Sequence, residues 1–189
     1  EEDCFYNDHG AYVEKHEIAV NLKAQLDVPV VVENDVKSMM MGVQADNQYE
    51  SLAYVYMSQT GVGSAYYLNQ QILKGNQAFS GELGLLPYQQ PFMAVLEDIC
   101  VQLFMTIALT IDPKQIIVAG PRLSSLSLSH IKEKIQTYLS LRYQLDIDIS
   151  QDLISDGLNG LHYMGILRLF DIYTHYEKQT WKWIKNLFL

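Results

Sequence analysis

The chain has 189 residues, 49% of them hydrophobic, and a formal net charge of −9 at pH 7. That hydrophobic content is sufficient for a sizeable core, which excludes intrinsic disorder. The acidic balance argues against nucleic acid as a partner of this segment, because phosphate binding needs a basic surface.

The cysteines and the first residue bear on metal sites, disulfides and the cellular location. Cys4 and Cys100 show no metal-ligand spacing, so we expect no zinc, no disulfide framework and a cytoplasmic location. No apolar run reaches membrane-spanning length, and no membrane partner is expected. The chain begins with Glu rather than Met, so we expect a fragment of a longer protein.

The first 45 residues predict a leading segment, two helices and one short strand. Residues 1–16 are polar and acidic and are interpreted as a leading segment without a regular element. Apolar residues at helical spacing predict a helix over 18–26. The β-branched run at 30–32 is typical of a short buried strand, and residues 36–45 again have the composition of a helix.

Asn34 and Asp35 follow that predicted strand. Open α/β sheets bind ligands just beyond the carboxyl ends of their strands, which favours a binding role for both residues. Asp35 could then act as a catalytic base toward a sugar hydroxyl, with Asn34 holding a neighbouring hydroxyl. Alternatively, one of the two residues caps the helix that follows.

The stretch from Leu52 to Gly84 predicts strand, glycine loop, strand, turn, short strand and a second glycine-rich turn. In the loop Thr60–Gly63, glycines would let backbone N–H groups approach a bound ligand. A plain hairpin with a glycine bulge is the alternative interpretation. In the second turn, two glycines bracket the single acid Glu82.

The rest of the chain alternates between helix and strand. We expect helices over 93–111, 123–141 and 158–176, strands over 115–119 and 145–149, and an apolar tail over 178–189. The strand at 145–149 has one polar face and is expected at or near a sheet edge. The order of elements predicts an α/β fold, a mixed sheet with helices on both faces.

Single residues refine this outline. Ser124 or Ser125 can cap the helix over 123–141. Gly160 and Gly165 are placed for close packing of the last helix against a strand. The tail is rich in apolar residues, and we expect it to pack on this domain or on another part of the protein.

Several motifs occur together in an order that resembles the ROK family of repressors and sugar kinases. They are Val28–Asp35, Thr60–Gly63, Gly75, Gly81–Gly84 and Asp112–Gly120, and residues 150–165 are similar to the family's closing region. The resemblance covers about residues 22–170. It implies the actin-like, ribonuclease-H-like ATPase fold, with residues 1–189 as a C-terminal domain.

The resemblance also implies roles for single residues. Asp35 matches the family's catalytic base, and Asn34 and Glu82 match further sugar-binding residues. Thr60, Gly61, Gly63 and Gly120 match positions that bind the nucleotide. A homo-oligomer is expected from the family alone.

Departures from the family pattern bear on catalysis. Leu85 replaces a sugar-contacting histidine and cannot form hydrogen bonds. Pro121 replaces a second adenosine glycine, and Lys37 stands where the family usually has Asn. The cysteine-rich zinc loop and the N-terminal phosphate hairpin are both missing from the sequence. We therefore expect this chain alone not to be a competent kinase.

Three functions remain open from the sequence. The first is a sugar-sensing domain of a ROK-type transcriptional regulator, or a degenerate ROK protein, that binds a sugar or sugar phosphate. The second is the C-terminal half of a divergent ATP-dependent sugar kinase, which would need ATP and Mg. The third is a structural domain without a ligand, in which the tail serves assembly.

Overall fold

The computed structural model describes residues 5–8, 13–16, 18–26, 28, 30, 32–59, 61–76, 79–86, 96–139 and 143–188. The chain divides into two compact units, Glu1–Asn34 and Asp35–Leu189.

The first unit contains a hairpin and a helix. Strands β1 (Phe5–Asp8) and β2 (Val13–His16) pair antiparallel. Helix α1 (Ile18–Gln25) follows, as predicted. The expectation of an irregular leading segment was wrong for the two strands. The apolar residues of these strands, Phe5, Tyr6 and Val13, do not alternate with polar ones, so the hairpin leaves no period-2 pattern in the sequence.

The second unit is built on a mixed sheet whose described strands have the order β5–β4–β3–β6–β7. Its strands are β3 (Ser51–Met57), β4 (Val62–Leu68), β5 (Gln71–Ile72), β6 (Gln115–Ala119) and β7 (Ile147–Ile149). Strands β3, β4 and β5 form an antiparallel meander, whereas β6 pairs parallel with β3 and with β7. The predicted meander, central strand and edge strand are confirmed.

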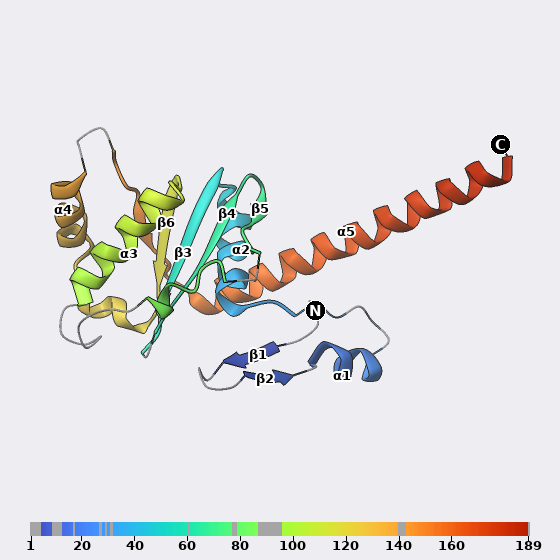
Figure 1. Ribbon diagram of the computed structural model, residues 1–189, viewed down its shortest axis with the longest axis horizontal. Helices are drawn as coiled ribbons and strands as arrows, with labels where there is room; N and C mark the ends of the chain where they lie inside the picture. Colours follow the sequence, from blue (N-terminus) through green and yellow to red (C-terminus); the bar gives the residue numbers. More distant parts are fainter. Residues whose placement is uncertain are drawn as a thin grey trace. The chain divides into compact units, whose positions relative to one another are not determined.

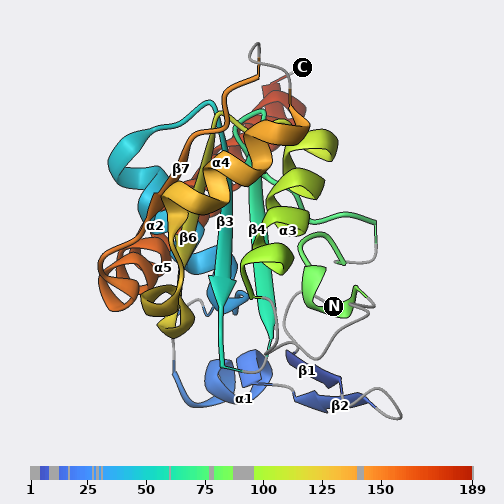
Figure 2. The ribbon, with the colours of Figure 1, turned by 90° about the vertical axis from the view of Figure 1, so that its left-hand side faces the viewer.

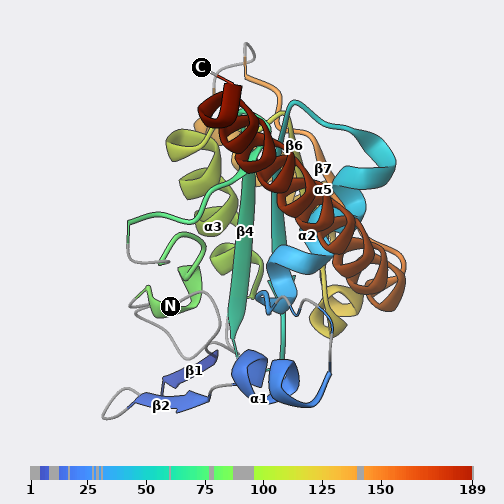
Figure 3. The same ribbon diagram turned by 90° about the vertical axis from the view of Figure 1, so that its right-hand side faces the viewer.

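Helices cover both faces of this sheet, as predicted, and Figure 1 labels the elements. Helices α3 (Leu96–Thr110) and α4 (Leu128–Tyr138) lie on one face, which Figure 2 shows from the front. Helices α2 (Asp35–Asn47) and α5 (Leu153–Phe188) lie on the other, seen in Figure 3. Short helices η1 (Leu83–Leu85) and η2 (Pro121–Ser125) complete the unit.

The side chains of β3 alternate between two hydrophobic cores. Ala53, Val55 and Met57 belong to the core beneath α3 and α4, whereas Leu52 and Tyr54 belong to the core beneath α2 and α5. The central strand is therefore buried on both faces, as its apolar sequence predicts.

The predicted strand at 30–32 was wrong for the residues that the structure describes there. Val30 and Val32 have no strand assignment and are only partly buried. A β-branched run favours extended backbone, but a strand forms only where a neighbouring strand takes up its hydrogen bonds.

The helix predicted over 123–141 is divided into η2 and α4. Ser127 caps α4, because its Oγ accepts the backbone N–H of His130 at 3.3 Å. The predicted cap was therefore wrong. Ser125 Oγ instead donates to the carbonyl oxygen of Arg122 at 2.8 Å, and Ser124 Oγ lies 3.5 Å from that of Pro121.

Helix α5 is longer than predicted and includes all but the last residue of the expected apolar tail. Gly160 packs against helix α2 rather than against a strand, because a Cβ there would lie 1.7 Å from the Ser38 carbonyl oxygen. A Cβ at Gly165 would meet nothing within 4 Å. Within the described residues, no helix is both long and apolar enough to span a bilayer.

Candidate functional site

The first predicted sugar-binding acid begins helix α2. Asp35 is exposed, and its Oδ1 accepts the backbone N–H of Val36 at 2.8 Å. This bond satisfies one of the amide groups that a helix start leaves without an intrahelical partner. Asp35 thus supports the start of the helix while its carboxylate remains at the surface. Asn34 belongs to the first unit, where its N–H donates to Glu33 Oε1 at 3.0 Å.

The second predicted acid, Glu82, lies in a turn that is bonded to β4. The backbone N–H of Ser64 donates to the Gly81 carbonyl oxygen at 2.9 Å. Gly81 has a φ of +101°, and a Cβ there would lie 1.9 Å from the Ser64 carbonyl oxygen. At Gly84 a Cβ would lie 2.6 Å from the carbonyl oxygen of Val62. Only glycine fits this approach, and the exposed Glu82 is held between the two.

The segments that carry the two acids contact one short part of β4. Gly63 lies so close to α2 that a Cβ would come 2.9 Å from Cγ2 of Val36, the residue after Asp35. The Glu82 turn contacts the residues on either side of Gly63. The two acids therefore lie near the start of β4, beside the carboxyl end of β3. Exposed carboxylates at such a sheet edge can accept hydrogen bonds from sugar hydroxyls.

The predicted phosphate loop is a tight turn between β3 and β4. The N–H of Ser58 donates to the Gly61 carbonyl oxygen at 3.0 Å, and the N–H of Gly61 donates to Ser58 Oγ at 2.9 Å. Thr60 lies outside the described residues. The amide of Gly61 is therefore engaged within the turn, and a Cβ at residue 63 would crowd the Val36 side chain of α2. This arrangement fits a plain hairpin better than a cradle for nucleotide phosphates.

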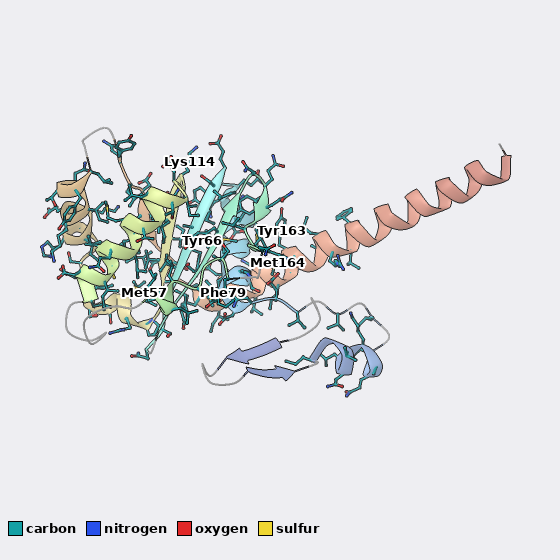
Figure 4. All side chains as sticks on the ribbon, in the orientation of Figure 1. Met57, Tyr66, Phe79, Lys114, Tyr163 and Met164 are labelled. Atoms are coloured by element: carbon teal, nitrogen blue, oxygen red, sulfur yellow. The ribbon has the colours of Figure 1, made fainter. Side chains whose placement is uncertain are left out.

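Gly120 joins β6 to η2 at the same edge of the sheet. Its φ is +121°, and a Cβ would lie 2.3 Å from the carbonyl oxygen of Met57, the last residue of β3 (Figure 4). Glycine is therefore required here by a contact inside the protein. The structure brings the described nucleotide-site candidates, Gly61, Gly63 and Gly120, to one end of β3, close to the two acids.

A partly buried polar cluster lies on the α2–α5 side of the sheet. Tyr54 Oη donates to Asp156 Oδ2 at 2.9 Å, and Ser150 Oγ donates to the same oxygen. Burial, together with the neighbouring Asp156 carboxylate, raises the pKa of Tyr54 above its usual value. The cluster joins β3 to the end of β7 and the first turn of α5. It forms no sequence motif, and only the resemblance of residues 150–165 pointed to this region.

The structure also places the departures from the family pattern. Leu85 ends η1 with 68% of its surface exposed, so an apolar side chain faces solvent close to Glu82. Lys37 is buried in α2, two residues after Asp35. Across the described part of the chain, His, Cys, Asp and Glu side chains form no group that could hold a metal ion.

The model of the ROK family matches residues 4–101, which are 98 of the 189 residues. The chain belongs to the ROK family. The matched segment includes both acids and both glycine turns, whereas Gly120 lies beyond it. No curated protein matches the sequence of this ROK chain.

Two solved structures resemble this ROK chain. A ROK family protein from Streptococcus pneumoniae, in complex with sucrose, has a TM-score of 0.58 and 17% identity, and the match covers 72% of this chain and 65% of that one. Lmo2764 from Listeria monocytogenes, a predicted N-acetylmannosamine kinase, has a TM-score of 0.63 and 15% identity, with 80% and 70% covered. At these identities the likeness shows the fold, the actin-like, ribonuclease-H-like ATPase fold. The chain spans about two thirds of the length of each.

Proposed function

We propose that this chain is a sugar-sensing domain, either of a ROK-type transcriptional regulator or of a degenerate ROK protein. The observation that carries the proposal is that exposed Asp35 and Glu82 both adjoin residues that contact the start of β4, Val36 at Gly63 and the Glu82 turn at Val62 and Ser64. Carboxylates can hold sugar hydroxyls without any chemical step. Phosphoryl transfer, in contrast, depends on a preorganised phosphate cradle and bound magnesium.

Two further observations support a binding role. The similar S. pneumoniae ROK protein was solved with sucrose. The net charge of −9 is suited to a domain that leaves DNA contact to a separate basic segment of a regulator. A sensor of this kind needs neither ATP nor magnesium.

The alternative is the C-terminal half of a divergent ROK-family sugar kinase. The likeness to Lmo2764 favours it, because that protein is a predicted kinase with the higher TM-score of the two. The amide of Gly61 argues against it, since it donates to Ser58 Oγ rather than standing open to a phosphate. We expect no phosphorylation of hexoses by this chain. Phosphorylation at ordinary enzyme rates would refute that expectation.

The test is titration calorimetry of the chain with hexoses, N-acetylated amino sugars, their 6-phosphates and Mg-ATP. Asp35→Asn and Glu82→Gln keep the size of each side chain and remove its charge. For a ligand that binds, each change should weaken affinity roughly 10- to 100-fold, the usual loss for a hydrogen bond to a charged group. Asp46→Asn is the matched control, because Asp46 is an exposed acid near the other end of α2.

The outcomes separate the functions. Sugar binding that fails in both site variants and persists in Asp46→Asn supports the sensor. Binding of Mg-ATP together with a sugar supports the kinase. Sugar binding that neither Asp35→Asn nor Glu82→Gln weakens would show that the proposed site is wrong. Full-length protein that binds no sugar would leave the structural domain as the better description.

A further inference from the structure

Helix α5 is much longer than the helix it packs against. It has 36 residues, about 54 Å at 1.5 Å per residue, whereas α2 has 13. Figure 1 shows α5 continuing past α2. The side of α5 that contacts α2 carries Gly160, which meets Ser38, and Met164, which packs on the core of α2. Beyond these residues, α5 extends past the helix against which it packs.

Apolar residues lie on the opposite side of α5. Ile166, Leu169 and Phe170 are 38%, 48% and 64% exposed. At 100° per residue, Ile166 and Leu169 lie roughly half a turn around the helix from Gly160 and Met164, and Phe170 lies about a quarter to a third of a turn away. They are therefore not part of the surface that holds α5 to the sheet.

The sequence continues this pattern along the helical backbone to Phe188. On the same side as Ile166 and Leu169 fall Ile172, Tyr173, Tyr176, Trp181, Trp183, Ile184, Leu187 and Phe188. The lysines recur at helical spacing on the other side, at positions 178, 182 and 185. Between residues 166 and 188 the two acids are Asp171, at a position on the lysine side, and Glu177, at a position on the apolar side, and no acidic residue follows Glu177. We call residues 166–188 the distal segment of α5.

The width and composition of the apolar side indicate what covers it. It occupies about half of the helix circumference, wider than the two-position seam of a coiled coil. Its aromatic residues are of the kind that gathers at membrane–water interfaces. Lysines on the polar side complement anionic headgroups.

We propose that the distal segment of α5 is an amphipathic helix that lies in the interface of a membrane containing anionic lipids. From the sequence we expect no membrane partner, because no run is long enough to span a bilayer. An interfacial helix needs no such run, since it buries only one side among the headgroups and upper acyl chains. This binding is independent of the sugar site, and either can fail without the other.

The chain offers a built-in reporter for the test. Its two tryptophans, Trp181 and Trp183, both lie in the distal segment. The full chain is mixed with vesicles of phosphatidylcholine and phosphatidylserine, and tryptophan emission and co-sedimentation are measured. We expect a blue shift of the emission and sedimentation with these vesicles. Binding to phosphatidylcholine alone should be about a hundredfold weaker, the combined effect of three lysines.

Paired variants distinguish vesicle binding by the distal segment from nonspecific binding by the rest of the chain. Changing Lys178, Lys182 and Lys185 together to Glu should abolish vesicle binding. The same change at Lys74, Lys114 and Lys132 adds equal negative charge elsewhere in the chain. It should leave vesicle binding within about twofold, because those lysines lie outside α5. Likewise, Ile184→Asp should abolish the blue shift, whereas Leu109→Asp, at an exposed position on α3, should not.

Other results would overturn the proposal. Binding that survives the triple Glu change in the distal segment would show that its lysines do not recruit lipid. Emission that is already blue-shifted without vesicles, in a chain that scatters light as a dimer, would show that a second copy covers this side. The absence of any vesicle binding in a chain with native circular dichroism would also refute it.

Discussion

The two faces of the sheet are covered by helix pairs that are held in different ways. On one face, α3 and α4 pack through aliphatic and aromatic side chains, with Phe104 and Ile131 fully buried. On the other, α2 and α5 approach so closely that backbone meets backbone at Gly42 and Gly160. That second face also holds the polar cluster of Tyr54.

The difference shows what each face tolerates. The α3–α4 face gains its stability from the area of apolar surface that it buries. A substitution there should therefore lower the free energy of unfolding in proportion to the side-chain volume that it removes. The α2–α5 face depends on the absence of side chains at single positions. A substitution that adds atoms at such a position should therefore lower the free energy of unfolding. Because α2 carries Asp35 and Val36, the second face also positions the candidate site.

The largest effect is expected on the aliphatic face. Phe104→Ala should lower the free energy of unfolding by roughly 3–5 kcal/mol, because it leaves a cavity beneath α4. Urea denaturation followed by circular dichroism measures it. Leu109→Ala, on the same helix at 71% exposure, should change it by less than about 0.5 kcal/mol. Equal losses in the two variants would contradict the burial of Phe104.

The next largest effect tests the close face. Gly160→Ala should lower the free energy of unfolding by roughly 1–3 kcal/mol, since its Cβ would overlap the Ser38 carbonyl oxygen and force α5 away from α2. In Gly165→Ala, five residues along the same helix, the Cβ meets nothing, and better helix propensity should raise it by about 0.5–1 kcal/mol. Changes of the same sign in the free energy of unfolding of the two variants would contradict the close contact at Gly160.

Sequence reasoning served the two faces unequally. Helices α3 and α4 bury aliphatic residues at regular spacing, as Leu103 and Ile107 do, and such periodicity is visible in a sequence. Gly160 was noticed, but its partner was predicted to be a strand, because a glycine reveals that something comes close and not what. For the candidate site, Asp35 and Glu82 came from the family resemblance, while the contacts of their neighbouring residues with the start of β4 required coordinates.

A smaller effect tests the polar cluster. Tyr54→Phe should lower the free energy of unfolding at pH 7 by roughly 1–2 kcal/mol, because Asp156 loses a hydrogen-bond donor. The raised pKa of Tyr54 means that the folded state holds this proton more tightly than the unfolded state. That contribution is fully present below the usual tyrosine pKa of 10.0 and is lost as the pH rises above it. The difference between wild type and Tyr54→Phe should therefore shrink above pH 10. A constant difference at all pH values would show that the phenol contributes by packing alone.

The smallest effect concerns the start of α4, where the sequence pointed to the wrong serine. Ser127→Ala removes the oxygen that accepts the His130 N–H, and should lower the free energy of unfolding by about 0.5–1 kcal/mol. Ser124→Ala is the matched control and should have almost no effect, because its hydroxyl lies at 3.5 Å from the Pro121 carbonyl oxygen. The reverse ranking would mean that η2 and α4 form one continuous helix in solution. The aliphatic face would then begin one turn earlier, since the buried Ile131 and Ile135 would belong to a longer helix.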